Sequence, residues 1–180
     1  MNKDIHTLIS NIAERDINAL GELYDMMSFR IFNYARTIVK NKEMAEDITH
    51  DVFLQINKQA VRIAKTTDPF AYIMTMTRNH SYNLIKRGNQ ITDSSNDVFE
   101  ISDDSSPYNR LLFADAFSGL PANRRETVYL HLICGFSFKE VAKMQNAPKV
   151  TVKWRYSKAL SQLQAYFIQD NEEGNYNATY

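Results

Sequence analysis

Apolar residues recur at every third or fourth position through the first part of the chain, which is the spacing of amphipathic helices. The longest run predicts one long helix, with apolar positions at Leu20, Leu23, Tyr24, Met27, Ile31, Phe32, Ala35, Ile38 and Val39. A shorter helix is predicted before it from Ile5, Leu8, Ile9 and Ile12. After a polar break at Asn41-Lys42, a third helix is predicted from Ala45, Ile48, Val52, Phe53 and Ile56.

A fourth helix is predicted to begin at Asp68-Pro69 and to run to about Arg87. An aspartate can accept a hydrogen bond from an N–H group at a helix start, and a proline pre-sets the backbone of the first turn. Four helices within residues 1–87 can enclose an apolar core. We therefore expect a first helical domain in this range.

Residues 88–109 interrupt the helical pattern. They begin GNQITDSSNDVFEISDDSSPY and carry five acidic side chains without a Lys or Arg. A segment of this composition cannot bury enough apolar area to offset the entropy cost of ordering. We expect a flexible acidic linker here.

Helical spacing resumes near residue 111, is broken before Pro121, and continues from Pro121 to a stop at Gly135. Ser137 and Glu140 then have the Ser-x-x-Glu order of a capping box, which predicts the start of another helix. The fold class we predict is all-α, with two small helical domains joined by the linker. The second domain is expected over residues 110–168, and a disordered polar tail over residues 169–180.

The segment SFKEVAKMQNAPKVTVKWRYSKAL has the spacing of a helix-turn-helix. Ala142 lies four residues before Asn146, and Val152 lies six residues after it. Two helices that cross closely need a small residue at the crossing, a turn residue that tolerates left-handed backbone, and a branched apolar anchor on the second helix. Ala, Asn and Val meet these needs.

The second helix of this motif has two different faces when its residues are placed at about 100° intervals. The arc expected to face the core is Val152, Tyr156, Ala159, Leu160, Leu163 and Phe167. The opposite arc is Val150, Thr151, Trp154, Ser157, Lys158 and Ser161, with Lys153 and Arg155 on its flanks. No carboxylate lies between Lys149 and Phe167. Cations suit phosphates, and hydroxyl and flat apolar groups suit base edges, so this face is expected to read DNA. The alternative is that Trp154 packs against a neighbouring helix and the lysines are merely solvated.

The predicted helix at residues 68–87 also has a polar face without a carboxylate after Asp68. Its outward positions are Tyr72, Thr75, Met76, Asn79, Asn83 and Lys86, edged by Tyr82 and Arg87, and its inward ones are Ile73, Met74, Thr77, Ser81, Leu84 and Ile85. Rings that stack on unpaired bases and amides that read base edges favour single-stranded nucleic acid. A plain polar surface explains this face equally well.

The third predicted helix carries a different surface, with Glu43, Asp47 and Asp51 on one side at four-residue spacing. Phe53 and Gln55 are expected to be exposed beside them. No histidine or glycine-rich loop is placed to complete a catalytic or metal site with these carboxylates. A docking surface for a basic protein partner and a solvated acidic stripe both fit the pattern.

The charge balance supports separate partners for separate parts of the chain. The net charge of the whole chain is zero, but its segments differ: the charge is +2 over residues 1–87, −5 over residues 88–109 and +6 over residues 121–160. The single cysteine, Cys134, excludes an internal disulfide and favours a reducing compartment, and the charged N-terminal stretch predicts neither a signal peptide nor a membrane span. We expect a soluble cytoplasmic protein. An enzyme is disfavoured, because the histidines are scattered and the chain has no Walker-type loop, so neither a cofactor nor a metal is expected.

In their order, these segments resemble the extracytoplasmic-function type of RNA polymerase sigma factor, a member of the sigma-70 family. ALGELYDMMSFRIFNYARTIV, AEDITHDVFLQI and DPFAYIMTMTRNHSYNLIKR are similar to the family's region two. LPANRRETVYLHLICGFSFKEVAKMQNAPKVTVKWRYSKAL is similar to region four. The resemblance covers about residues 17–165, and it implies a promoter-specificity subunit of bacterial core RNA polymerase.

The resemblance also implies roles for particular positions. Those implied to dock on the clamp coiled coil of the polymerase's largest subunit are Asp47, Asp51, Phe53 and Gln55. Those implied to melt and read the minus-ten element are Tyr72, Arg78, Asn79, Asn83, Lys86 and Arg87. Those implied to read the minus-thirty-five element are Lys149, Thr151, Lys153, Trp154, Arg155 and Lys158. Further implied partners are the polymerase flap region, promoter DNA and an anti-sigma factor that can hold the protein at the membrane.

Some positions depart from the family pattern. Val150 and Trp154 stand where the family usually has Gly and Ser, Tyr72 stands for its usual Trp, and Asn83 for its usual Asp. The first two changes lie on the reading face, so we expect Trp154 to set an unusual promoter preference. The remaining alternative is a helix-turn-helix regulator that binds duplex DNA without polymerase. This alternative leaves the Tyr72 face and the acidic helix without a function.

Overall fold

The computed structural model describes residues 2–87 and 114–176, and their regular elements are all helices. The chain divides into two compact units, Met1–Ser95 and Asn96–Tyr180. The predicted all-α class with two helical domains is therefore confirmed for the described residues. The predicted linker over residues 88–109 lies outside them, and so do the residues at which the second domain was expected to begin.

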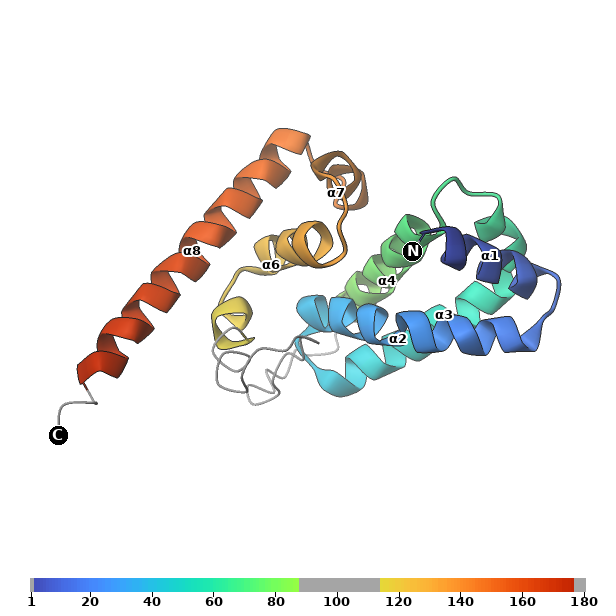
Figure 1. The fold of residues 1–180 in the computed structure, drawn as a ribbon, viewed down its shortest axis with the longest axis horizontal. Coiled ribbons are helices and arrows are strands. Elements are labelled where there is room, and N and C mark those ends of the chain that lie inside the picture. The colour runs from blue at the N-terminus through green and yellow to red at the C-terminus, as the bar shows by residue number, and fades with distance from the viewer. Residues whose placement is uncertain (1, 88–113, 177–180) are drawn as a thin grey trace. The chain divides into compact units, whose positions relative to one another are not determined.

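The first unit is a bundle of four helices, as the apolar spacing predicts. They are α1 (Asn2–Ala13), α2 (Ile17–Val39), α3 (Lys42–Ala64) and α4 (Pro69–Lys86). The helices α2 and α3 lie side by side, and α1 and α4 each pack against both (Figure 1). Fully buried side chains fill the space between them, among them Ile5, Ile9, Leu23, Met27, Ile31, Tyr34, Ile56, Ile63, Ile73 and Met74.

Side-chain caps fix where the helices of the first unit begin. Asp16, Asn41 and Asp68 precede α2, α3 and α4, and each accepts a hydrogen bond from a backbone N–H in the first turn. Such a cap contributes about 1 kcal/mol because it satisfies a donor that has no partner within the helix. Lys40 ends α2 in the left-handed conformation, with φ at 54°, and so turns the chain directly into α3.

The second unit is built from shorter helices that pack against one long helix. Residues 114–118 are helical and are followed by α6 (Ala122–Val128), the π-helix η1 (Tyr129–Ile133), α7 (Phe138–Met144) and α8 (Lys149–Tyr176). The predicted helix from Pro121 to about Cys134 is thus an α-helix that widens into a π turn. Its end agrees with the sequence, since Gly135 has a φ of +78°, which a side chain would make unfavourable.

The helix α8 extends beyond its expected end. Residues 169–176 were predicted as part of a disordered tail, but α8 continues to Tyr176. Extending an existing helix costs far less than starting one, and no proline interrupts this stretch, so its polar composition does not stop the helix. Figure 1 shows the C-terminal part of α8 running past α6 and α7.

Candidate nucleic-acid interface

The turn between α7 and α8 has the geometry that the helix-turn-helix spacing predicts. Asn146 adopts the left-handed conformation with φ at 47°, and the Ala147 N–H donates to the Ala142 carbonyl at 3.0 Å. The capping box at the start of α7 is also confirmed. The Ser137 N–H donates to Glu140 Oε2 at 2.7 Å, and the Glu140 N–H donates to Ser137 Oγ at 3.3 Å. Hydrogen bonding of the Glu140 carboxylate to Ser137 lowers the pKa of Glu140 below its ordinary value, the Ser137 hydroxyl having the largest effect and the Ser137 backbone N–H the next.

The inward face of α8 largely agrees with the prediction. Val152, Ala159 and Leu163 are buried, and Tyr156 and Phe167 are half-buried. Leu160 was expected in the core, but it is 40% exposed. It lies at the edge of the apolar arc, where the helices that cover the centre of the arc no longer reach it.

A hydrogen-bonded group locks α8 onto the rest of the unit. Thr127 of α6 and Gln145, at the end of α7, are buried and hydrogen-bonded to each other, with Gln145 Nε2 donating to Thr127 Oγ1 at 3.0 Å. Arg155 Nη1 donates to Gln145 Oε1 at 2.8 Å. Of the residues predicted to read the minus-thirty-five element, Arg155 is thus half-buried and tied inward. Its first effect is to fix the rotation of α8.

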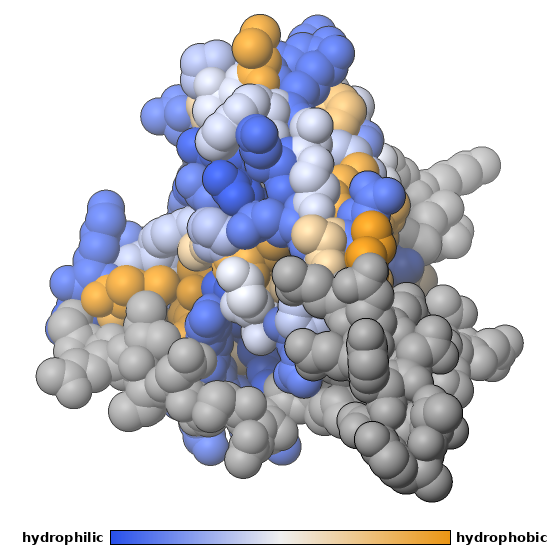
Figure 2. All heavy atoms as spheres, turned by 90° about the vertical axis from the view of Figure 1, so that its left-hand side faces the viewer, coloured by the Kyte–Doolittle hydropathy of each residue, from blue (hydrophilic) through white to orange (hydrophobic). Residues whose placement is uncertain are grey.

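The other predicted reading positions form an open basic surface. Lys149, Lys153, Trp154 and Lys158 are exposed, and Thr151 is half-buried. Figure 2 shows one side of the molecule, on which hydrophilic side chains (blue) lie beside hydrophobic ones (orange). Because the lysines share the surface with hydroxyls and one large ring, it can contact both phosphates and base edges.

A shallow depression beside the turn extends this basic surface. The residues that line it are Lys139, Ala142, Lys143, Asn146, Ala147, Pro148 and Lys149. Sequence reasoning counted Lys139 and Lys143 in the charge of the region but did not predict them as site residues. Their shared position at the turn becomes visible only when α7 and α8 are packed together. The depression is lined by two lysines of α7 and by Lys149 at the start of α8, and three ammonium groups at one place suit a phosphate.

The one histidine of the second unit, His131, is part of an aromatic cluster. The His131 ring stacks on Phe138 at 3.9 Å between centroids and meets Tyr156 edge-on at 4.8 Å. Its Nδ1 lies 2.7 Å from the Phe136 carbonyl oxygen. The residues His131, Phe138 and Tyr156 therefore join η1, α7 and α8. Among the described residues, no group of three His, Cys, Asp or Glu side chains could hold a metal ion.

The outward face of α4 in the first unit is partly open. Asn79, Asn83, Lys86 and Arg87 are exposed, while Tyr72 and Arg78 are half-buried. The Tyr72 hydroxyl donates to Gln59 Oε1 at 3.2 Å, and the Arg62 guanidinium lies 5.8 Å from the Tyr72 ring centre. The Arg78 guanidinium lies 4.5 Å from the Tyr82 ring centre. Two tyrosine rings are thus held beside cations along one helix.

The acidic face of α3 differs from the prediction at Phe53 and at Gln55, which were both expected to be exposed. Glu43, Asp47 and Asp51 are exposed as expected. Phe53 was expected to be exposed, but it is 6% exposed and lies against the Tyr24 ring of α2, with 4.8 Å between centroids. The correction follows from the position of α2, which covers this side of α3.

Leu54 is an exposed apolar residue of α3 that the sequence analysis did not identify as part of this surface. It is 44% exposed, and at seven residues after Asp47 it lies on the same side of the helix as the carboxylates. Gln55 is half-buried, and its Oε1 accepts a hydrogen bond from Gln59 Nε2 at 2.9 Å. The exposed surface on this side of α3 therefore consists of three carboxylates, with Leu54 one turn beyond Asp51.

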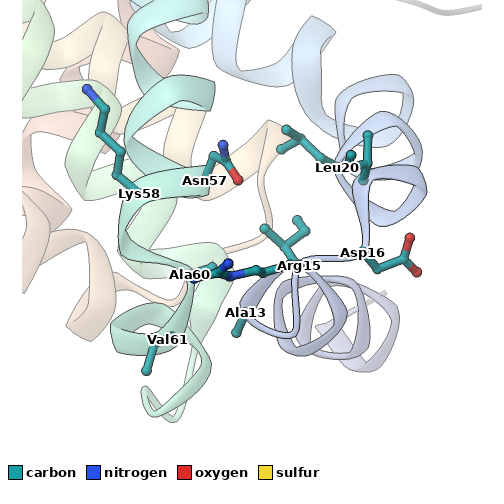
Figure 3. Close-up of a pocket in the computed structure, with 10 residues that line it drawn as sticks. Ala13, Arg15, Asp16, Leu20, Asn57, Lys58, Ala60 and Val61 are labelled. Carbon is teal, nitrogen blue, oxygen red and sulfur yellow. The ribbon is translucent and has the colours of Figure 1, made fainter.

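The first unit also has a groove between the α1–α2 turn and the second half of α3 (Figure 3). The residues that line it are Ile12, Ala13, Arg15, Asp16, Ile17, Leu20, Asn57, Lys58, Ala60 and Val61. Its one carboxylate is the N-cap of α2, which accepts from the Asn18 N–H at 2.9 Å. This groove does not assemble the acid, base and nucleophile of an enzyme site.

Two family models match this chain in order. Residues 23–90 match Sigma-70 region 2, and residues 110–163 match Sigma-70, region 4. The chain is 21% identical over 164 residues to the ECF RNA polymerase sigma factor SigK of Mycobacterium sp. (strain KMS), with 84% of each chain covered. It is 24% identical over 134 residues to the RNA polymerase sigma factor CarQ of Myxococcus xanthus, covering 71% of this chain and 77% of CarQ.

Two solved structures have a similar fold. The sigma factor RpoE of Bartonella quintana, solved with the anti-sigma factor NepR, matches with a TM-score of 0.66 at 22% identity, covering 84% of this chain and 98% of that one. CnrH, solved with the cytosolic domain of CnrY, matches with a TM-score of 0.64 at 19% identity, covering 93% and 99%. At these identities the likeness supports the fold. No helix within the described ranges is both long and apolar enough to span a bilayer.

Proposed function

Because this chain belongs to the sigma-70 family of RNA polymerase sigma factors, in its extracytoplasmic-function type, we propose that it binds core RNA polymerase and directs it to promoters, which it reads and melts. The observation that carries the proposal is the pairing of two surfaces in one chain. A helix-turn-helix with a carboxylate-free reading face follows a bundle whose acidic helix and aromatic-amide helix are both exposed.

We propose that α8 reads the minus-thirty-five element in the major groove. Lys149, Lys153 and Lys158 would neutralise phosphates, and each such contact releases counterions from the duplex. Lys139 and Lys143 line the depression at the turn and would add to this contact. Arg155 would act through the position of α8, because its guanidinium is hydrogen-bonded to Gln145.

We propose that α4 opens and reads the minus-ten element. Stacking on a ring stabilises an unpaired base by about 1 to 3 kcal/mol, so a protein that offers fixed rings favours the melted strand. Tyr72 suits this task because it is only half-buried and Gln59 holds its hydroxyl. Asn79 and Asn83 would read base edges, and Arg78, Lys86 and Arg87 would contact phosphates.

We propose that α3 docks on the clamp coiled coil of the largest polymerase subunit through Asp47 and Asp51, with Leu54 about one turn beyond Asp51 on the same side of the helix. The buried Phe53 supports this surface from below by packing on Tyr24. Gln55 is joined through Gln59 to Tyr72, so the docking helix and the minus-ten helix share one hydrogen-bonded chain. A further contact with the polymerase flap belongs to the second unit. The protein would act in the bacterial cytoplasm, and an anti-sigma factor would hold it inactive.

The alternative function is a helix-turn-helix regulator that binds duplex DNA without polymerase. The basic face of α8 favours both functions equally. The exposed carboxylates of α3 distinguish them, since a repressor has no need of an acidic surface that repels DNA.

A charge reversal on α3 tests the proposed docking. We expect Asp47→Lys to weaken binding to purified core RNA polymerase at least about tenfold, because it places a like charge against a basic partner surface. Glu14→Lys is the matched control, since it makes the same charge change at the exposed residue that directly follows α1. Affinity is measured by fluorescence anisotropy of the labelled full-length chain. Equal affinity of the two variants would show that the acidic face of α3 does not dock.

A further inference from the structure

Two apolar side chains stand on the reading face of α8 without apolar cover. Val150 is 79% exposed and Trp154 is 51% exposed. They lie four residues apart, at the second and sixth positions of α8, so their side chains are neighbours on one side of the first turns. In a helix-turn-helix, residues near the start of the second helix contact base edges. We call Val150 and Trp154 the apolar pair.

The indole of Trp154 is held from one side by a residue of another helix. The Arg124 guanidinium, from the first turn of α6, lies 5.3 Å from the centre of the Trp154 ring. Arg124 Nη1 also donates to Gln162 Oε1, which lies two turns further along α8. The guanidinium therefore bridges two points of α8 and occupies one side of the indole, while half of the Trp154 side chain stays exposed.

Such a clamp restricts the rotamers of a large exposed side chain before any ligand arrives. An exposed tryptophan loses conformational freedom when it binds, and a ring that is already fixed loses less. Because Arg124 is itself cationic, it holds the indole without neutralising the positive charge of the three exposed lysines. A fixed flat ring and a branched aliphatic group present an apolar surface to whatever enters the groove.

We propose that the apolar pair reads the 5-methyl groups of thymine in the major groove, with Arg124 as a positioning residue that acts through Trp154. This inference rests on the proposed function, in which α8 enters that groove. The thymine methyl is the one apolar group that a base pair displays there, and apolar side chains are its usual contact. The lysines beside the pair bind phosphates or guanine, so they cannot account for a preference for a methyl group.

Uracil substitution tests the proposal because it removes only the methyl group. Duplexes are first selected from a random pool by holoenzyme, assembled from the full-length chain and core RNA polymerase. Each thymine of the selected minus-thirty-five element is then replaced by uracil. We expect about a fourfold loss of binding at one or two adjacent positions, the effect of one buried methyl group. Trp154→Ser should abolish this loss, and Trp154→Phe, which keeps an apolar ring, should retain it.

Two matched variants test the positioning role of Arg124. Gln162→Ala removes the residue that tethers Arg124 and leaves every charge in place, while Gln164→Ala makes the same change at an exposed position that no such contact involves. We expect Gln162→Ala to bring the thymine-to-uracil ratio closer to one with an unchanged salt dependence. Gln164→Ala should keep the wild-type ratio. Equal ratios for the two variants would overturn the positioning role.

The outcomes separate this inference from the proposed function. If the wild-type holoenzyme selects no duplex, the proposed function fails. If it selects duplexes but every uracil substitution is neutral, or if Trp154→Ser keeps the wild-type sensitivity, the reading of thymine methyls is wrong and the proposed function stands. Thermal unfolding of each variant confirms that the compared proteins are folded.

Discussion

At the scale of single residues, the cations of the reading face fall into two kinds. Lys153 and Lys158 are exposed, whereas Arg155 is half-buried and donates to Gln145. Arg125 is buried, and its Nη1 donates to the Ser118 and Leu120 carbonyls, so it holds the chain before α6 together. The formal charge of a segment therefore overstates the charge available to DNA, and Lys153 and Lys158, which are exposed, are positions at which a phosphate contact can be measured.

We expect Lys153→Ala and Lys158→Ala each to lower the salt dependence of binding to the minus-thirty-five duplex by about one unit of log–log slope. Each lost phosphate contact releases about one counterion fewer. Holoenzyme affinity is measured over a series of salt concentrations. Lys65→Ala, which removes an exposed lysine of the first unit, is the control and should leave the slope unchanged. Slopes that do not differ from wild type would place both lysines away from phosphate.

At the scale of elements, local signals could be predicted from the sequence and contacts between helices could not. Asp68 and the Ser137–Glu140 box define helix starts because a cap depends only on residues within one turn. Phe53 was misplaced because its burial depends on Tyr24, which belongs to another helix. The Arg124–Trp154 contact depends in the same way on how α6 packs against α8. A helical wheel contains no information about the neighbouring helix, so it identifies a face but not its cover.

The capping box of α7 has a pH dependence that can be tested. The pKa of Glu140 is lowered in the folded protein, chiefly by the Ser137 hydroxyl, so the ionised carboxylate stabilises the fold. This contribution is complete above the ordinary glutamate pKa and is lost as the pH falls through the lowered pKa. We expect Glu140→Gln to be less stable than wild type at neutral pH, and the difference to vanish in acid. Glutamine retains a hydrogen-bond acceptor, so the variant removes the charge alone.

The measurement is denaturant unfolding across a pH series, followed by the fluorescence of Trp154, the one tryptophan of the chain. Because Trp154 lies in the second unit, the signal reports on the unit that contains the capping box. Asp115→Asn, which removes an exposed carboxylate of the same unit, is the control. A difference between Glu140→Gln and wild type that stays constant with pH would contradict the assignment.

At the scale of the whole molecule, two helices of different units carry surfaces of opposite charge. The acidic surface of α3 lies in the first unit and the basic surface of α8 in the second. This division suits a protein that holds a protein partner with one unit and DNA with both. The polar α4 face and the α8 face would then act on two separate promoter elements.

The most direct test of this account is promoter opening by the reconstituted holoenzyme. Purified core RNA polymerase is incubated with promoter DNA, with and without the full-length chain, and permanganate reactivity of the minus-ten thymines is measured. We expect reactive thymines and defined transcription starts only when the chain and core polymerase are both present. If the chain instead binds the same duplex tightly by itself, gains nothing from core polymerase and opens no base pair, the protein is a polymerase-independent regulator.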